Sequence, residues 1–282
     1  MVEAIQLWRY PVKSMQGEVV EQISLTELGV AGDRTWATRD LARGGIRGAK
    51  QLGGLMSFAA THPAGAAAPI ITMPDGSTIA ADAPDASERL SAALDHPVRL
   101  EPLAPADDLD HYRRGPPDDP DPMVNLRTTL ALEPDEPLPD FSGLPSAVME
   151  FGSPPGTYHD VFPLLLLTTA SLAALAALAP SSVIGVRRFR PSILLDAGVG
   201  ADAAGFVEQS WSGRRARIGT AVIEIGPPCP RCVMITRAFA EFPADRSLMR
   251  VLVRENHQSL GVYATVIEPG LVRTGDTLEL ID

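Results

Sequence analysis

Short apolar runs separated by turn-forming residues dominate the first hundred positions of the chain. Ile5 and Leu7 alternate with polar neighbours up to the Tyr10-Pro11 break, a pattern typical of a half-buried strand. A helix is expected over 86–94, where leucine and alanine side chains fall on one face. The further strands expected in this part are 20–25, 35–38, 70–73 and 78–80. The pattern predicts a small β-barrel-like domain over residues 1–104.

The chain changes character over residues 105–122, which are rich in aspartate and proline. Such a stretch buries little apolar surface, so an exposed linker is expected there. Residues 123–282 return to short strands, with one helix expected over 169–179. The strands expected in this part are 162–167, 193–195, 221–225, 233–236, 262–267 and 277–281. The sequence therefore predicts a β-rich α+β fold of two barrel-like modules with a few helices.

The charge of the chain narrows the classes of ligand. Its 282 residues carry a formal net charge of −11, which argues against nucleic acid as a partner. Arginines gather at 187–190 and 214–217, so a small anionic ligand can still find a locally basic surface. Lysine occurs only as Lys13 and Lys50, which leaves two candidates for Schiff-base chemistry.

Cysteine usage and hydropathy bear on the compartment. With Cys229 and Cys232 as the only cysteines, no disulfide framework is expected, and a reducing compartment, the cytoplasm, is favoured. The N-terminus lacks the pattern of a secretory signal. Residues 161–180 carry no charge, but their helix-like part would be only about 16 Å long, too short to span a bilayer. No membrane span is expected.

Cys229 and Cys232 form a CxxC that is open to several interpretations. Such a pair can be half of a zinc site, although the sequence has no second cysteine pair. It can be a redox pair, although the following residues resemble a strand and not a helix. One thiolate can also bind a soft or redox metal, with the adjacent Arg231 stabilising negative charge. Two inert core cysteines are the fourth interpretation.

Four other segments could bind a polar ligand. Lys13-Ser14 follows the first strand and can donate to a phosphate or a polar heterocycle, although a surface lysine is commoner. Asp33-Arg34 could be an anion contact or a structural ion pair. The arginines of 187–192 could meet a planar anion or lie in solvent. Residues 168–171 include hydroxyl side chains at the start of an expected helix. Such residues are equally typical of an anion site and of plain N-capping.

Taken in order, these segments resemble a MOSC protein with an N-terminal β-barrel domain. The resemblance is to the two-domain group that includes the mitochondrial amidoxime reducing component and its bacterial relatives. The motifs that carry it are Tyr10-Pro11-Val12-Lys13-Ser14, Gly32-Asp33-Arg34-Thr35-Trp36, Thr168-Thr169-Ala170-Ser171-Leu172, Arg188-Phe189-Arg190-Pro191, Pro228-Cys229-Pro230-Arg231-Cys232, Leu260-Gly261-Val262-Tyr263 and Gly275-Asp276-Thr277. The resemblance implies that residues 123–282 form a MOSC-type barrel that binds a molybdenum cofactor.

The resemblance also implies particular site residues. The second cysteine of the motif, Cys232, would be the protein ligand of molybdenum. Arg231 and Tyr263 would act beside it in catalysis. The residues expected around the cofactor are Lys13, Ser14, Arg34, Thr168, Thr169, Ala170, Arg190, Ser192, Pro230, Arg231 and Tyr263. Cys229 is expected to be a packed neighbour.

The activity implied is that of an oxidoreductase that reduces an N-hydroxylated or N-oxygenated small molecule by oxygen-atom transfer. Electrons are expected from a separate donor protein of the iron–sulfur, flavin or cytochrome type, because the chain lacks a four-cysteine set. Two alternatives stay open at this point: a sulfur carrier or transferase of the molybdenum cofactor sulfurase type, and a non-catalytic cofactor-binding or storage protein. Pyridoxal phosphate chemistry is not expected, because no domain of adequate size accompanies the two lysines.

Overall fold

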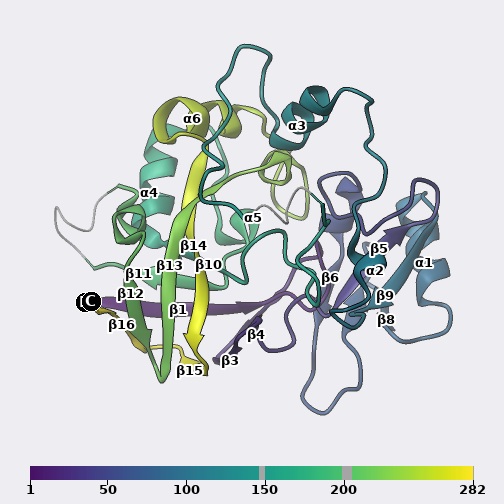
Figure 1. The fold of residues 1–282 in the computed structure, drawn as a ribbon, viewed down its shortest axis with the longest axis horizontal. Coiled ribbons are helices and arrows are strands. Elements are labelled where there is room, and N and C mark those ends of the chain that lie inside the picture. Colours follow the sequence, from purple (N-terminus) through teal and green to yellow (C-terminus); the bar gives the residue numbers. More distant parts are fainter. Residues whose placement is uncertain (146–149, 199–204, 282) are drawn as a thin grey trace.

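The computed structural model describes residues 1–145, 150–198 and 205–281, and its larger part is a closed β-barrel (Figure 1). The barrel strands, in the order in which they are hydrogen bonded, are β11 (Ile193–Asp196), β10 (Leu164–Thr168), β14 (Ser259–Glu268), β13 (Ala221–Pro230), β12 (Arg215–Ile218), β16 (Thr277–Ile281) and β1 (Val2–Arg9), with β2 (Glu18–Val20) as an extension. Strand β1 pairs with both β16 and β11, which closes the ring. Strands β10 and β11 run parallel, and the other neighbours in the ring run antiparallel.

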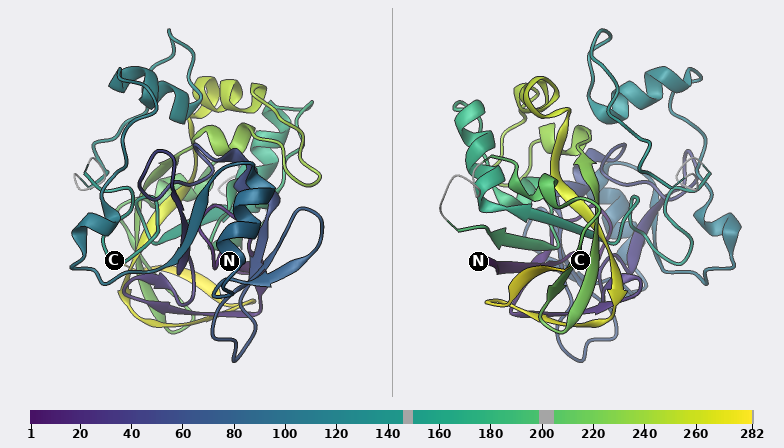
Figure 2. Two further views of the ribbon diagram at one scale, coloured as in Figure 1. Left: turned by 90° about the vertical axis from the view of Figure 1, so that its right-hand side faces the viewer. Right: turned by 60° about the vertical axis from the view of Figure 1, so that its left-hand side comes forward.

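Alternation of side chains along these strands fills the barrel. Leu7, Leu166, Ile223 and Val262 point inward and are fully buried in one cluster. A second cluster lies under the helices α4 (Thr169–Leu178) and α6 (Ser247–Asn256), which Figure 2 shows at one end of the barrel.

The smaller part is a β-rich module built from residues that precede the linker. It contains β5 (Trp36–Asp40) paired with β9 (Val98–Pro102), β6 (Ala59–Thr61), β7 (Ile70–Thr72) and β8 (Thr78–Ala80) in a second sheet, the 3-10 helix η1 (Gly53–Ser57), and α1 (Ala86–Leu94). A separate sheet joins β3 (Gln22–Thr26) to β4 (Gly29–Val30) and to β15 (Gly270–Arg273). Met234, Phe239 and Phe242 reach from the C-terminal half into the core of the smaller module. The two parts therefore share a packed boundary.

The fold class is as predicted, but several elements differ from the sequence prediction. The strand expected at 233–236 is wrong: Val233–Thr236 form a 3-10 helix, η5, which begins after Cys232. The strand expected at 20–25 is interrupted at Glu21. The linker over 105–122 contains a short helix, α2 (Leu109–Tyr112), and α3 (Pro122–Leu130) begins at its end. Helix α6 was not expected.

The domain boundaries at residues 104 and 122 stay a prediction. The hydrogen bonding between strands crosses these boundaries. Strand β1 lies before residue 104, yet it completes the barrel whose other strands lie after residue 122. Within the described residues, no helix combines the length and apolar character needed to cross a bilayer.

Candidate functional site

Lys13 lies in the turn that leads out of the barrel after β1, at the boundary with the smaller module. The Pro11 ring ends the strand, and the side chain of Lys13 is buried. Its Nζ donates to Asp160 Oδ1 at 2.6 Å, to Tyr158 O at 2.8 Å and to Ser153 Oγ at 3.4 Å. Burial lowers the pKa of Lys13, and the carboxylate of Asp160 partly opposes this. Lys13 is therefore fixed between segments distant in sequence.

Asp160 bridges both lysines of the protein. Lys50 Nζ lies 3.1 Å from Asp160 Oδ2, and Lys13 holds the other carboxylate oxygen. Desolvation favours the neutral carboxyl, but the two ammonium groups outweigh it and hold the pKa of Asp160 well below its ordinary value. The carboxylate is thus charged at neutral pH and orients both lysines.

Ser14 and Arg34 adopt left-handed backbone conformations in the turns beside Lys13, with φ of 71° and 47°. Ser14 Oγ accepts a hydrogen bond from Ala49 N at 2.8 Å, which places the turn containing Lys50 against the turn containing Lys13. Arg34 forms an ion pair with Asp33. These turns place Ser14, Arg34 and Lys50 near Lys13.

Arg190 and Tyr10 form the barrel side of the same region. The Arg190 guanidinium lies 4.2 Å from the centroid of the Tyr10 ring, and its Nη1 donates to Met15 O. Burial, together with the nearby Arg34, lowers the pKa of Arg190 to about 10. Its Nη2 is buried without a hydrogen-bond partner. An unsatisfied guanidinium donor of this kind is costly unless a ligand or water accepts from it.

Ser192 and Tyr263 lie at the same level of the barrel. Ser192 N donates to Leu165 O at 2.8 Å, and Leu165 N donates to Ser192 Oγ at 3.3 Å. Tyr263 lies opposite Leu165 on β14, and its ring stacks on Phe162 with centroids 4.7 Å apart. Burial raises the pKa of Tyr263 well above its ordinary value, so the phenol is neutral.

The two cysteines have different environments at the end of β13. Cys229 is 5% exposed, and Arg231 Nη1 donates to its Sγ at 3.2 Å. Burial raises the pKa of Cys229, although Arg231 partly opposes the shift. Nη2 of Arg231 donates to Phe189 O at 2.7 Å, so the Arg231 side chain points towards the protein interior. Cys232 is partly exposed and is the N-cap residue that precedes η5.

Two arginines hold the turn that carries Cys232. Arg188 is buried and donates to Ile235 O at 2.7 Å and to Pro243 O at 3.0 Å, so it binds the backbone of η5 and the loop beyond. Arg237, which ends η5, donates through Nη2 to Lys50 O at 2.7 Å. The short helix η5, which follows Cys232, is therefore tied through Arg237 to the turn that carries Lys50.

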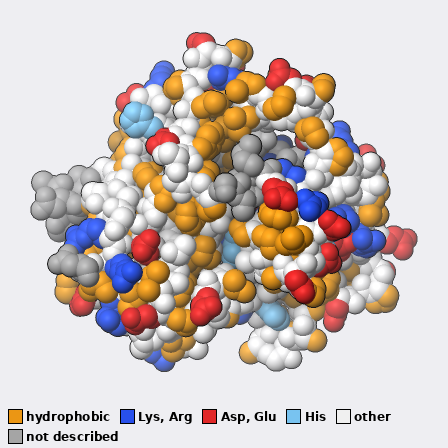
Figure 3. All heavy atoms as spheres, in the orientation of Figure 1, with side chains coloured by type: hydrophobic (Ala, Val, Ile, Leu, Met, Phe, Trp, Pro, Cys, Tyr) orange, Lys and Arg blue, Asp and Glu red, His pale blue; other side chains and the backbone are white. Residues whose placement is uncertain are grey.

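The sequence prediction missed Asp160, Lys50, Arg188 and Arg237 as members of the site. Asp160 lies in an irregular segment without a recognisable motif, so no sequence signal pointed to it. Arg188 was expected only as part of a basic segment, whose three arginines in fact diverge. Figure 3 shows Lys and Arg side chains intermixed with Asp and Glu side chains on the right of the view, over the smaller module.

Two family models match the two parts of the chain. The model of the MOSC domain matches residues 154–279, and the model of the MOSC N-terminal β-barrel domain matches residues 1–112. The chain is a MOSC domain protein. Membership of this family points to a function associated with the molybdenum cofactor.

Solved structures similar to this MOSC protein share little sequence with it. YUAD protein from Bacillus subtilis is 12% identical, with 99% of this chain and 96% of that chain covered and a TM-score of 0.44. YiiM from Geobacillus stearothermophilus is 13% identical with a TM-score of 0.32, and YiiM from Escherichia coli is 17% identical with a TM-score of 0.33. For both YiiM proteins, 43% of this chain and 55% of that chain are covered, about half of their length. No curated protein matches the sequence.

The start of α4 in the MOSC domain lies further along β10 than Ser192 and Tyr263. Leu165, beside Ser192, is three positions before Thr168, which corresponds to about 10 Å along a strand. Thr168 is fully buried at the other end of β10 and donates to Glu208 Oε2 at 2.7 Å. Thr169 donates to Asp196 at 3.2 Å, and Ala170 follows it in the helix. Thr168, Thr169 and Ala170 therefore lie beyond the level of Ser192 and Tyr263 along β10, and their place in a cofactor site stays a prediction.

The remaining residues fit a molybdenum cofactor. A pterin that carries a phosphate and binds a metal needs cations, hydroxyl or backbone donors and a thiolate. Arg190 Nη2 is a buried donor without a partner, and Cys232 is a partly exposed thiol. Within the described ranges, no group of three His, Cys, Asp or Glu side chains could hold a metal ion.

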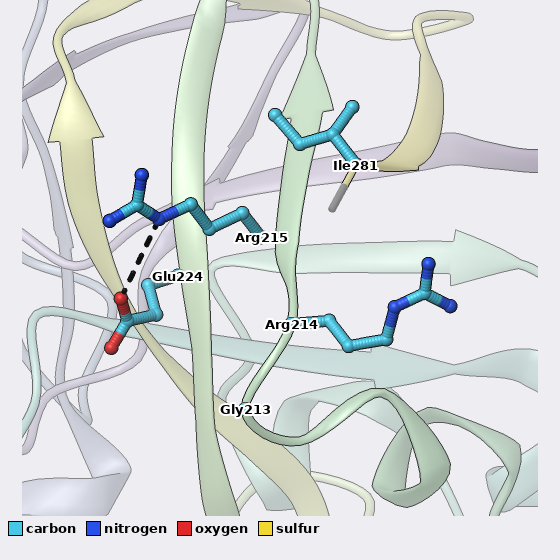
Figure 4. A pocket seen from close by; sticks show the side chains of 5 residues that line it. All are labelled: Gly213, Arg214, Arg215, Glu224 and Ile281. Atoms are coloured by element: carbon cyan, nitrogen blue, oxygen red, sulfur yellow. Dashed lines mark ion pairs between the residues drawn. The ribbon is translucent and has the colours of Figure 1, made fainter.

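A depression of about 250 Å³ on the barrel lies apart from this region. Its lining residues are Gly213, Arg214, Arg215, Glu224 and Ile281 (Figure 4). Arg215 Nε lies 3.9 Å from Glu224 Oε2, an exposed pair on neighbouring strands. The depression includes no predicted site residue.

Proposed function

We propose that this MOSC protein binds a molybdenum cofactor at the boundary between barrel and smaller module, and that it reduces N-hydroxylated or other N-oxygenated small molecules. The observation that carries the proposal is the environment of Cys232. Cys232 is partly exposed and lies near the charges of Lys50, Arg231 and Arg237, whereas Cys229 is buried and contacts Arg231. A thiolate among cations is suited to a metal that carries an anionic ligand.

The proposed roles follow from the contacts of each residue. Cys232 is the protein ligand of molybdenum. Arg190 and Arg34 hold the phosphate and the polar edge of the pterin, with the free Nη2 of Arg190 as one donor. Ser14 supplies a hydroxyl in the same turn as Lys13. The ammonium group of Lys13 is itself held by three acceptors. Ser192, Pro230, Arg231 and Tyr263 form the barrel wall beneath.

When bound, the cofactor supplies two-electron oxygen-atom transfer. The chain positions the substrate, and its cations stabilise negative charge on the oxygen that is transferred. On the barrel side of the site, the phenol of Tyr263 stays neutral and the guanidinium of Arg231 stays charged near neutral pH, because the pKa of each is raised. A separate redox protein of the iron–sulfur, flavin or cytochrome type donates the electrons. The two unpaired cysteines are suited to a reducing compartment such as the cytoplasm.

The test is purification from a host that makes the cofactor, followed by measurement of molybdenum and pterin per chain. Dithionite-reduced protein is then incubated with benzamidoxime, and formation of benzamidine is measured. We expect one molybdenum per chain and conversion of the amidoxime. Cys232→Ser should lower molybdenum and activity together. Cys229→Ser is the matched control, because it changes a thiol three residues away that lacks solvent access.

Two outcomes would contradict the proposal in different ways. Full molybdenum content in the Cys232→Ser protein would remove Cys232 as the ligand. A fully loaded protein that converts neither amidoximes nor hydroxylamines would leave cofactor binding intact and exclude the reductase.

A further inference from the structure

The cations of the site fall into two groups by exposure. Lys13 is buried, with 8% of its side chain exposed, and Arg190 is also buried. Lys50 lies further out, with 28% of its side chain exposed, beside Asp160 at 43%. A molecule that approaches Cys232 from solvent therefore meets Lys50 and Asp160 before it reaches the buried cations.

Backbone contacts fix Lys50 near Cys232. Arg237 ends the short helix that begins after Cys232, and its Nη2 donates to Lys50 O at 2.7 Å. Cys232 itself packs against the core of the smaller module, in the same cluster as Leu52, two residues beyond Lys50. Asp160, and after it Cys232, raise the pKa of Lys50 against the opposing effect of burial.

The charge balance of this outer region is positive. Lys50 and Arg237 contribute two positive charges and Asp160 one negative charge, and the buried Lys13 adds a third positive charge on the other oxygen of Asp160. The protein as a whole carries −11, so a positive region is contrary to its average surface. A region with an excess of one sign of charge raises the local concentration of ligands of the opposite sign.

Lys50 has donors to spare for such a ligand. An ammonium group has three N–H donors, and among the described residues its partner is Asp160. Arg34 pairs with Asp33, and Arg190 faces the buried side, so neither competes for a group that binds further out.

We infer that the substrate carries a carboxylate, and that Lys50 binds it beside Cys232 and thereby determines specificity. The inference rests on the proposed function, because it concerns the substrate of the same site. An N-oxygenated group would face the metal ligand while its carboxylate lies outward, against the Lys50 ammonium. A phosphate-bearing substrate would share this electrostatic preference, and a matched phosphonate distinguishes the two.

The test measures binding without turnover. Oxidised holoprotein, with no reductant present, is titrated calorimetrically with benzamidoxime, 4-carboxybenzamidoxime and the corresponding 4-phosphonate. A partly exposed ion pair should make the carboxylate bind about fivefold more tightly than the neutral compound at low salt. The ratio of the two affinities should fall towards one as salt is raised from about 20 to about 300 mM, because salt screens an electrostatic contact.

Three variants assign the preference to its residue. Lys50→Gln should bind the carboxylated and neutral compounds with equal affinity. Lys50→Arg should retain most of the preference for the carboxylated compound. Arg43→Gln is the control, because Arg43 is an exposed cation paired with Asp118, and neither is among the site residues. Molybdenum per chain is measured for each variant. The salt series on the wild-type protein tests the inference even if Lys50→Gln does not fold.

The outcomes separate the inference from the proposed function. Equal affinities of the wild-type protein for the neutral and carboxylated compounds, or an unchanged ratio in Lys50→Gln, would overturn the inference. Loss of molybdenum in Lys50→Gln would also overturn it, since Lys50 would then serve the cofactor. Preference for the phosphonate over the carboxylate would replace the carboxylate with a phosphate class. A salt-dependent preference without conversion of either amidoxime would refute the reductase and retain anion recognition.

Discussion

Replacement of Thr168 by valine separates a structural role from a cofactor contact. Thr168 is fully buried at the start of α4, where its Oγ accepts from Ser171 N at 3.0 Å and donates to Glu208 Oε2 at 2.7 Å. Ser171 Oγ donates to both oxygens of the same carboxylate, at 2.7 and 2.6 Å. Burial raises the pKa of Glu208, and these hydroxyl donors oppose the shift. Valine keeps the shape of threonine but removes both hydrogen bonds.

The expected loss of stability follows from the two contacts. Loss of an N-cap hydrogen bond costs about 1 kcal/mol. Loss of a buried hydrogen bond to a charged or strongly polar partner costs about 1.5–3 kcal/mol. We therefore expect Thr168→Val to lower the free energy of unfolding by about 2–4 kcal/mol. Thr169→Val, which removes an exposed contact with Asp196, should change it by less than about 0.5 kcal/mol.

The assay is equilibrium unfolding in urea at pH 7, with molybdenum per folded chain measured on the same preparations. A structural cap predicts lower stability and full molybdenum content for Thr168→Val. A large loss of molybdenum with stability unchanged would refute the reasoning, and would place the start of α4 in the cofactor site after all.

Three further predictions follow from the described contacts. Arg188→Met leaves buried carbonyl oxygens unpaired around η5, so the free energy of unfolding should fall by about 3–5 kcal/mol in urea; a loss below about 1 kcal/mol contradicts the role of the arginine. Burial, aided by Arg34, lowers the pKa of His159 from 6.5 to about 4. Its contribution to stability is therefore complete above pH 6.5 and is lost as pH falls towards 4, by up to about 3 kcal/mol. Unfolding at pH 7, 6 and 5 should show a weaker pH dependence in His159→Phe, and an identical dependence would disprove this. In metal-free protein, iodoacetamide should alkylate Cys232 before Cys229, which is buried and has a raised pKa; peptide mass spectrometry showing the reverse order would contradict the assignment of the exposed thiol.

Local periodicity explains which parts of the fold were predictable. The strands at 70–73 and 78–80 and the helix at 86–94 were confirmed because turn residues and apolar spacing specify them within a few positions. Residues 233–236 have the composition of a strand, but Arg188 binds the backbone of this segment and Met234 packs into the smaller module, so the chain forms η5. Tertiary contacts overrode the local preference there.

The sequence alone determined the β-rich class, the CxxC and the resemblance to MOSC proteins, because these depend on residues close together in the chain. Tertiary structure decided which cysteine meets solvent, because packing against Arg231 buries Cys229 and the turn after it exposes Cys232. It also placed Asp160 between two lysines 37 residues apart, a contact that no spacing encodes. Charge and hydrogen bonding across such distances exist only once the chain has folded, and the proposed site depends on them.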